Sequence, residues 1–171
     1  MVSNQVAIQQ ELDLFSSMSK DSRVWIWQST KEVSASDAIG VQSHMQDFVS
    51  QWVSHQKALV AKARFVLDRF LIVVLDQSVS GGASGCSIDS LTHEIQKLDH
   101  QYHLGFMDRT KFCFWQEGQI LTVSMQELSN ILGDGRLSVD SLVFDNLVNS
   151  LEALRNSWLK PLSQSWHHRF A

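Results

Sequence analysis

The chain has 171 residues and a formal net charge of −4 at pH 7, and 44% of its residues are hydrophobic. A chain of this length buries roughly 70% of its extended-chain surface on folding, so we expect one globular domain over residues 1–171. The net negative charge and the scattered Lys and Arg residues argue against a nucleic-acid-binding protein.

The same sequence argues against secretion and membrane insertion. The segment MVSNQVAIQQELD has no basic stretch followed by an apolar run, and the longest apolar run is far shorter than the ~20 residues of a membrane span. Cys86 and Cys113 are too few for a disulfide framework and are not spaced as zinc ligands. We therefore expect a soluble cytoplasmic protein with free thiols, no bound metal and no cofactor.

The first part of the chain is predicted to form a helix, a strand and a second helix. Apolar residues at helical spacing predict a helix over residues 4–17. The stretch RVWIWQS predicts a strand that is apolar on both faces, either central in a sheet or in contact with a partner through Trp25 and Trp27. Ser34, with Asp37 three residues later, can cap a following helix that reaches about residue 55.

The middle of the chain contains the strongest strand and helix signals. LVAKARFVLDRFLIVVLD predicts two strands that turn near Asp68 and Arg69, and a single bent strand is the alternative. The glycine-rich stretch VSGGASGCSID then precedes the most regular amphipathic helix, predicted over residues 87–103. Gly105 is its expected C-terminal stop.

The last third is predicted to contain a hairpin and two short helices. KFCFWQ and QILTVS flank Glu117 and Gly118, a two-residue hairpin turn. Ser124 with Glu127 forms a capping box for a short helix that ends at the turn over residues 133–135. A final helix begins at Asn149 and ends before Pro161.

The order of these elements predicts the fold class. A β-α-β-β-α-β string in a small domain indicates an α+β protein with a single antiparallel sheet and helices packed on it. We expect a ferredoxin-like core with additional N- and C-terminal helices.

The glycine-rich loop over residues 81–87 resembles a phosphate-binding loop but lacks its lysine. A P-loop has the pattern GxxxxGK[ST], because the lysine neutralises the phosphates, and this pattern is absent from the chain. Ser84, Gly85 and Ser87 could still form an anion-binding nest at the helix start. The alternative is that these residues only cap the helix.

Cys86 is the second chemical candidate, because a helix N-terminus lowers the pKa of a thiol and favours the nucleophilic thiolate. His93 lies two helical turns away, ~10 Å along the axis, so a base for Cys86 has to come from elsewhere in the fold, for instance from His167. A buried cysteine with a packing role is the alternative.

Several strings together resemble an uncharacterised family of small bacterial cytoplasmic proteins that often carry the automated label "ABC transporter ATPase". They are RVWIWQ, LDRFLIV, ASGCSID, FMDR, LVFDNLV and SWHHRF. The resemblance implies no established activity. The label itself does not fit the chain, because Walker motifs are absent and only Ser80, Gly81 and Gly82 match the LSGGQ signature loop.

These strings contain polar residues that either pin turns and strand ends or converge on one cleft. They are Arg23, Asp68, Arg69, Cys86, Ser87, Asp89, His93, Asp108, Arg109, Asn146, Trp166, His167 and Arg169. The residues alone support three hypotheses. The first is a non-catalytic binding or interaction protein for a small anionic ligand or a protein partner, dimeric through Trp25 and Trp27. The second is a thiol-dependent enzyme or redox sensor centred on Cys86, with His93 or His167 as acid or base. The third is nucleotide or anion binding at the glycine-rich loop.

Overall fold

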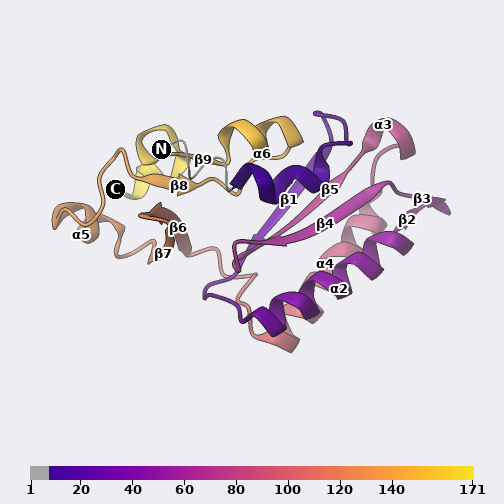
Figure 1. Ribbon diagram of the computed structural model, residues 1–171, viewed down its shortest axis with the longest axis horizontal. Coiled ribbons are helices and arrows are strands. Elements are labelled where there is room, and N and C mark those ends of the chain that lie inside the picture. Colours follow the sequence, from indigo (N-terminus) through magenta and orange to yellow (C-terminus); the bar gives the residue numbers. More distant parts are fainter. Residues whose placement is uncertain (1–7) are drawn as a thin grey trace.

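The computed structural model describes residues 8–171 (Figure 1). Helices and antiparallel sheets are mixed along the chain, so the α+β class is confirmed. Within this range, no helix has both the length and the apolar character needed to cross a membrane.

A three-stranded antiparallel sheet, here called sheet A, lies between two groups of helices. Its strands are β1 (Arg23–Gln28), β4 (Ala61–Val66) and β5 (Phe70–Leu75), in the order β1-β5-β4. The prediction of two strands with a turn near Asp68 and Arg69 is therefore confirmed. The expectation that the RVWIWQS strand is central is wrong, because β5 is the only described strand that pairs with β1, which lies at the edge of the sheet.

Helices cover both faces of sheet A (Figure 1). On one face lie α2 (Ala35–Gln51) and α4 (Gly85–Tyr102), and on the other lie the N-terminal helical residues and α6 (Leu151–Ser157). Since side chains alternate along a strand, β5 contributes to both cores and all six of its residues are buried. This double covering explains why β1 and β5 are apolar on both faces.

The helix starts follow the predictions more closely than the helix ends. The Ser34 hydroxyl accepts a hydrogen bond from the Asp37 N–H at the start of α2, as predicted. However, α2 ends at Gln51, because the chain turns into a short hairpin of β2 (Val53–Ser54) and β3 (Lys57–Ala58). The first predicted helix is seen as helical residues 8–12 and a 3₁₀ turn η1 (Asp13–Phe15), while residues 4–7 lie outside the described range.

The glycine-rich stretch forms a short helix α3 (Gln77–Ser80) and the loop that leads into α4. The predicted helix over 87–103 is confirmed, with its start two residues earlier. Its C-terminal cap is His103, which adopts the left-handed conformation with φ 52°. The role predicted for Gly105 is therefore taken by His103, whose left-handed backbone ends the helix two residues sooner.

A second, four-stranded sheet, here called sheet C, has the order β7-β6-β8-β9. The predicted hairpin is confirmed as β6 (Lys111–Gln116) and β7 (Gln119–Ser124), joined by Glu117 and Gly118 with φ 50° and 85°. Two further strands were not predicted, namely β8 (Leu142–Phe144) and β9 (Leu159–Pro161).

Short helical segments cover sheet C and end the chain. They are α5 (Leu128–Gly133) and the 3₁₀ turns η2 (Leu162–Gln164) and η3 (Trp166–Phe170). Ser124 contacts the Glu127 carboxylate through its hydroxyl, but Glu127 itself is the N-cap residue of α5. The N-cap of α6 is Ser150 rather than the predicted Asn149, because the Ser150 hydroxyl accepts from the Ala153 N–H.

The prediction of a single sheet is wrong, since the described strands form three sheets. In sheet A, β1 and β4 are both antiparallel to β5, so they run parallel to each other with β5 between them. This strand order is compatible with part of a split β-α-β sheet, but the predicted ferredoxin-like core is not confirmed, because the described strands form three sheets. The fourth strand of that plan is missing, because β6 joins sheet C instead of pairing with the free edge of β1.

Gly105 fixes the backbone between α4 and β6, and we expect Gly105→Ala to destabilise the protein. Its φ is +75°, and an added Cβ would lie 2.4 Å from the Thr30 hydroxyl oxygen. The left-handed conformation costs ~1–2 kcal/mol for a residue with a side chain, and the overlap adds ~1–3 kcal/mol. Gly135→Ala is the matched control, because Gly135 has φ +79° but an added Cβ would meet no other part of the protein within 4 Å.

Urea unfolding of both variants checks this prediction. The free energy of unfolding should fall further for Gly105→Ala than for Gly135→Ala. Equal losses would show that only the backbone conformation matters at residue 105.

Candidate functional site

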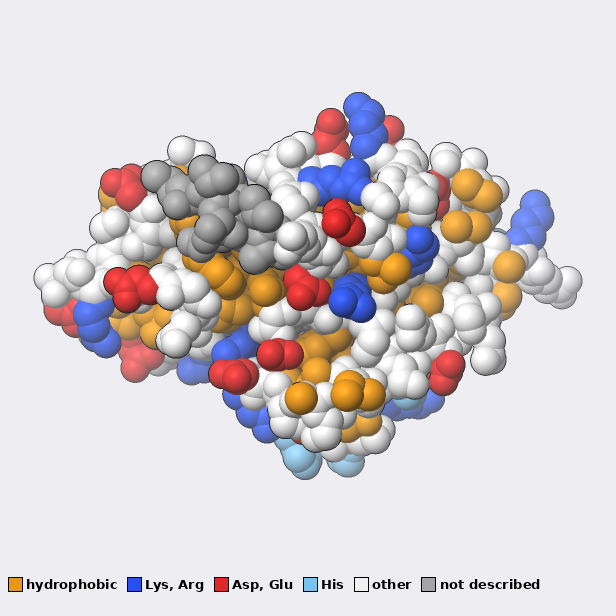
Figure 2. All heavy atoms as spheres, in the orientation of Figure 1, with side chains coloured by type: hydrophobic (Ala, Val, Ile, Leu, Met, Phe, Trp, Pro, Cys, Tyr) orange, Lys and Arg blue, Asp and Glu red, His pale blue; other side chains and the backbone are white. Residues whose placement is uncertain are grey.

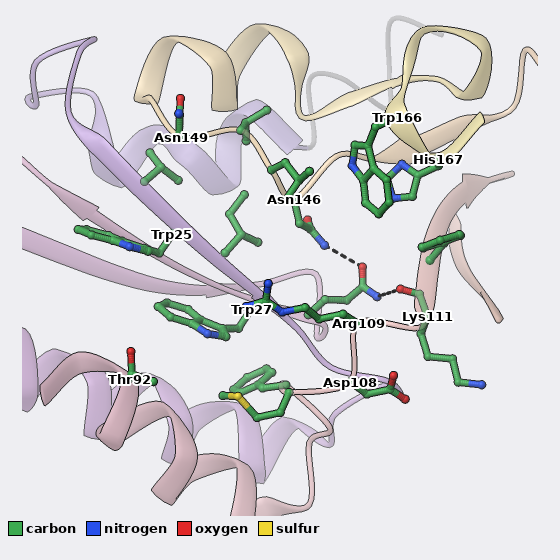
Figure 3. Close-up of a pocket in the computed structure, with 18 of the residues that line it drawn as sticks. Trp25, Trp27, Thr92, Asp108, Arg109, Lys111, Asn146, Asn149, Trp166 and His167 are labelled. Carbon is green, nitrogen blue, oxygen red and sulfur yellow. Dashed lines mark hydrogen bonds between the residues drawn. The ribbon is translucent and has the colours of Figure 1, made fainter. Parts of the chain in front are cut away.

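A cavity of ≈ 580 Å³ lies between sheet A and sheet C, along β1. Its walls come from β1, from α4 and the segment that follows it, from the segment after β8, and from η3 (Figure 3). This volume is in the range of small-ligand sites in proteins.

Tryptophan side chains form much of the apolar wall. Trp25 and Trp27 project from β1 toward α4, which contributes Leu91 and Thr92 (Figure 3). Trp25 packs edge-on against Trp52 with ring centroids 6.0 Å apart, so its position is fixed by the core under α2. Each indole presents a large flat apolar surface to the cavity at little entropic cost.

A chain of hydrogen bonds links the two sheets beside the cavity. The Trp158 indole N–H donates to Asn146, and the Asn146 amide donates to the Gln28 side chain, each at 2.9 Å. The Gln28 amide then donates to the Lys111 carbonyl oxygen at 3.0 Å (Figure 3). This side of the cavity is thus held by polar groups that already have partners.

The C-terminal turn η3 places Trp166 and His167 at the cavity. Trp166 donates its indole N–H to Asp145, which also pairs with Lys160. His167 is buried, stacks on Trp166 with centroids 4.0 Å apart, and is hydrogen-bonded to the Ser165 hydroxyl through Nδ1 at 2.6 Å. Burial lowers the pKa of His167 to about 4, against the opposing effect of Asp145, so the imidazole is neutral at pH 7.

The charges along the cavity are strongly one-sided. Its lining contains four cationic side chains and one carboxylate, Asp108; the cations are Arg23, Arg109, Lys111 and Arg169. None of these four cations forms an ion pair within 4.0 Å with another described residue. Oδ1 of the Asp108 carboxylate accepts hydrogen bonds from the hydroxyl and the N–H of Thr110.

Two of the cations are held over aromatic rings. The Arg23 guanidinium lies 4.5 Å from the centroid of Trp25, and the Arg169 guanidinium lies 5.3 Å from that of Trp166. Such stacking orients a guanidinium while leaving its N–H groups free to bind an anion. On the face shown in Figure 2, acidic and basic side chains are interspersed, whereas the cavity lining holds four cations and one carboxylate.

The predicted catalytic residues do not converge. His167 lines the cavity, whereas Cys86 and His93 do not. Both are exposed on α4, on the helix face opposite to Ile88, Leu91 and Thr92. The structure therefore provides no partner from the cavity for a reactive Cys86 thiol.

The predicted anion nest forms a helix cap. The Ser84 hydroxyl accepts from the Ser87 N–H, and the Ser87 hydroxyl donates to the Ser84 carbonyl oxygen. Trp52 in turn donates its indole N–H to the Ser87 carbonyl oxygen, which ties the loop to α2. Ser84, Gly85 and Ser87 all lie outside the cavity lining, so anion binding by them stays a prediction.

The polar residues of the sequence strings that resemble the family labelled "ABC transporter ATPase" divide into two groups. Seven of them converge on the cavity: Arg23, Asp108, Arg109, Asn146, Trp166, His167 and Arg169. Arg69 instead is buried behind the strand turn and donates to the Thr122 hydroxyl. Sequence reasoning missed Gln28 and Lys111, because neither belongs to a recognisable pattern, and their roles arise from the contact between the two sheets.

Comparison with family models, curated proteins and solved structures finds no match. The resemblance to the family labelled "ABC transporter ATPase" therefore stays a prediction. Among the described residues, no group of three or more His, Cys, Asp or Glu side chains is arranged to hold a metal ion.

The buried His167 makes the stability of the protein depend on pH. Its pKa is about 4 in the folded protein and ~6.5 in an unfolded chain, so the unfolded chain binds the proton more readily between these values. Stability is therefore lost as the pH falls from about 6.5 to about 4, by up to roughly 3 kcal/mol from this residue. We expect His167→Gln to remove this part of the pH dependence.

Urea unfolding at pH 7 and pH 4.5 measures the effect, and His168→Gln is the matched control because His168 is exposed. The difference in unfolding free energy between the two pH values should shrink only in His167→Gln. An identical change in both variants would contradict a buried neutral imidazole.

The two cysteines should differ sharply in reactivity. Cys86 is exposed, whereas Cys113 is fully buried and burial raises the pKa of its thiol to about 11. We expect iodoacetamide at pH 8 to modify Cys86 and to spare Cys113 in the folded protein, because alkylation needs an accessible thiolate. Peptide mass spectrometry locates the modification, and Cys86→Ser is the control. Modification of Cys113 at a comparable rate would contradict this burial.

Proposed function

We propose that this protein is a non-catalytic binding protein whose cavity recognises an anionic ligand. One observation carries the proposal. The cavity lining holds four cations that form no ion pair with another described residue, and only one carboxylate, although the chain has a net charge of −4. A concave site with mostly positive charge concentrates anions and orients their negative groups. No ATP hydrolysis is proposed, since the chain lacks the Walker lysine.

The tryptophans of the cavity define the second feature of the ligand. Trp25, Trp27 and Trp166 offer flat apolar surfaces beside the cations. A ligand that combines a flat or apolar part with a negative group would satisfy both kinds of surface. We therefore propose that the anion binds in this cavity and not at the glycine-rich loop.

The cavity favours binding over catalysis. Ser165 and His167 form a hydrogen-bonded hydroxyl-imidazole pair, but Ser165 is buried and does not line the cavity. Its hydroxyl therefore cannot reach a bound ligand as a nucleophile needs to. A thiol-dependent reaction at Cys86 receives no support from the geometry, because Cys86 lies outside the cavity.

The test compares two fluorescent probes of similar shape and different charge. 8-Anilinonaphthalene-1-sulfonate is a flat apolar anion, and N-phenyl-1-naphthylamine is its uncharged counterpart. We expect the sulfonate to bind at least about tenfold more tightly, because a charge-assisted hydrogen bond contributes ~1.5–3 kcal/mol. Equal affinities would contradict recognition of the negative charge.

Variants of the cavity locate the binding site. Arg109→Gln and Arg169→Gln should each weaken the sulfonate by about tenfold and leave the uncharged probe within about twofold. Lys57→Gln removes the same charge from the exposed β3 strand, outside the cavity, and is the matched control. An equal loss in Lys57→Gln would show that only the net charge of the protein matters.

A further inference from the structure

The cavity follows the edge of β1 rather than one of its faces. All six residues of β1 (Arg23–Gln28) line it. Successive side chains of a strand point to opposite faces, so a cavity on one face would contact only every second residue. Contact with every residue places the cavity beside the backbone, where a further strand would pair.

The pairing register shows which backbone groups face this edge. In an antiparallel ladder, alternate residues direct both their N–H and C=O groups toward the same neighbour. The N–H of Val24 donates away from β5, to the Asn149 carbonyl oxygen at 3.0 Å. Ile26 and Gln28 therefore direct their backbone groups to the same outer edge.

This outer edge is closed at both ends and open between them. Val24 is paired with Asn149, and beyond β1 the N–H of Thr30 donates to the Leu104 carbonyl oxygen at 2.9 Å. Within residues 8–171, the outward N–H groups of Ile26 and Gln28 have no hydrogen-bond partner. The open stretch lies where the fourth strand of a split β-α-β sheet would pair. In this protein β6 does not occupy that position, because it belongs to sheet C.

We propose that this edge binds a short acidic peptide segment of a partner protein, in extended conformation, as a fourth strand of sheet A. The proposal rests on the function proposed above and specifies its ligand. The unpaired backbone groups of Ile26 and Gln28 supply main-chain recognition, as in other cases of strand addition. Carboxylate side chains of the peptide meet the cations that line the cavity, namely Arg23, Arg109, Lys111 and Arg169.

The charge of the cavity selects this occupant over other peptides. A basic segment would meet four cations with one carboxylate between them, which opposes its binding. Alternating acidic and apolar residues suit the site best, since an added strand directs successive side chains toward α4 with Trp27 and toward Asn146 with Trp166.

The experiment uses synthetic peptides and the unaltered protein. The probe is a five-residue peptide of alternating glutamate and valine, acetylated and amidated, and its matched control replaces glutamate by lysine. Binding is measured by displacement of 8-anilinonaphthalene-1-sulfonate. We expect the glutamate peptide to displace the sulfonate and the lysine peptide to fail at tenfold higher concentration.

N-methylation of the peptide tests the pairing itself. Each backbone amide of the glutamate peptide is methylated in turn, which removes one N–H donor. We expect roughly tenfold weaker displacement when alternate amides are methylated, and little change for those between them, because only every second N–H faces β1. A shift of the peptide by one residue cannot hide this pattern, since it would exchange the acidic and apolar faces.

A second comparison alters the protein. Ile26→Pro removes the outward N–H at a position where an edge strand tolerates proline, and Ile26→Val keeps the N–H with a similar side chain. Displacement by the glutamate peptide should be at least about tenfold weaker in Ile26→Pro than in Ile26→Val. If Ile26→Pro fails to fold, the N-methyl series on the unaltered protein still decides the question.

The outcomes separate this inference from the proposed function. Binding of the sulfonate with no displacement by the peptide would overturn the inference and leave the anion-binding function standing. Peptide binding that is insensitive to the position of N-methylation would also overturn it, because charge alone would then explain the affinity. A dimer in sedimentation experiments that Ile26→Pro dissociates and Ile26→Val does not would assign the edge to a second copy of the chain and overturn it too. Failure of both the sulfonate and the peptide would overturn both proposals.

Discussion

The side-chain amide of Gln28 connects the two sheets, and the geometry of the cavity depends on it. Gln28 is the last residue of β1 and is buried, and its amide donates to the Lys111 carbonyl oxygen while accepting from Asn146. A buried amide without partners costs ~1–3 kcal/mol, so the chain is held where both hydrogen bonds form. This condition places the start of β6 and the segment after β8 at fixed positions beside β1.

The route of β6 explains why a cavity exists at all. In a four-stranded split β-α-β sheet, the strand after the second helix would pair with β1 and fill this space. Here β6 pairs with β7 and β8 and builds a separate core around Phe112 and Phe114. The space beside β1 is then bordered by α4, which supplies Ile88, Leu91 and Thr92, and by η3, which supplies aromatic and cationic side chains.

Local patterns predicted the helices and hairpins well, because capping serines, helical spacing and the Glu117-Gly118 turn act over a few residues. The assignment of β6 to a sheet could not be predicted, since its alternation suits either sheet equally. β8 and β9 have three residues each, too few for a periodic signal. The position of Cys86 at a helix start predicted a reactive thiol, but Cys86 lies on the face of α4 that points away from the cavity. The cavity is formed by segments that are distant in the sequence. The sequence therefore indicated single candidate residues but did not predict which of them lie close together.

The apolar character of β1 has a physical explanation that differs from the one expected from its sequence. Trp25 and Trp27 were expected to need a central strand or a partner chain, and the homodimer through them stays a prediction. In the structure, both indoles pack partly into the core under α2 and α4, while Val24 packs into the core under α6. Since its side chains pack partly into these two cores, β1 offers a ligand its backbone edge together with the parts of Trp25 and Trp27 that line the cavity. The cations around that edge therefore act together with main-chain groups, and a ligand that matches both must be acidic and extended.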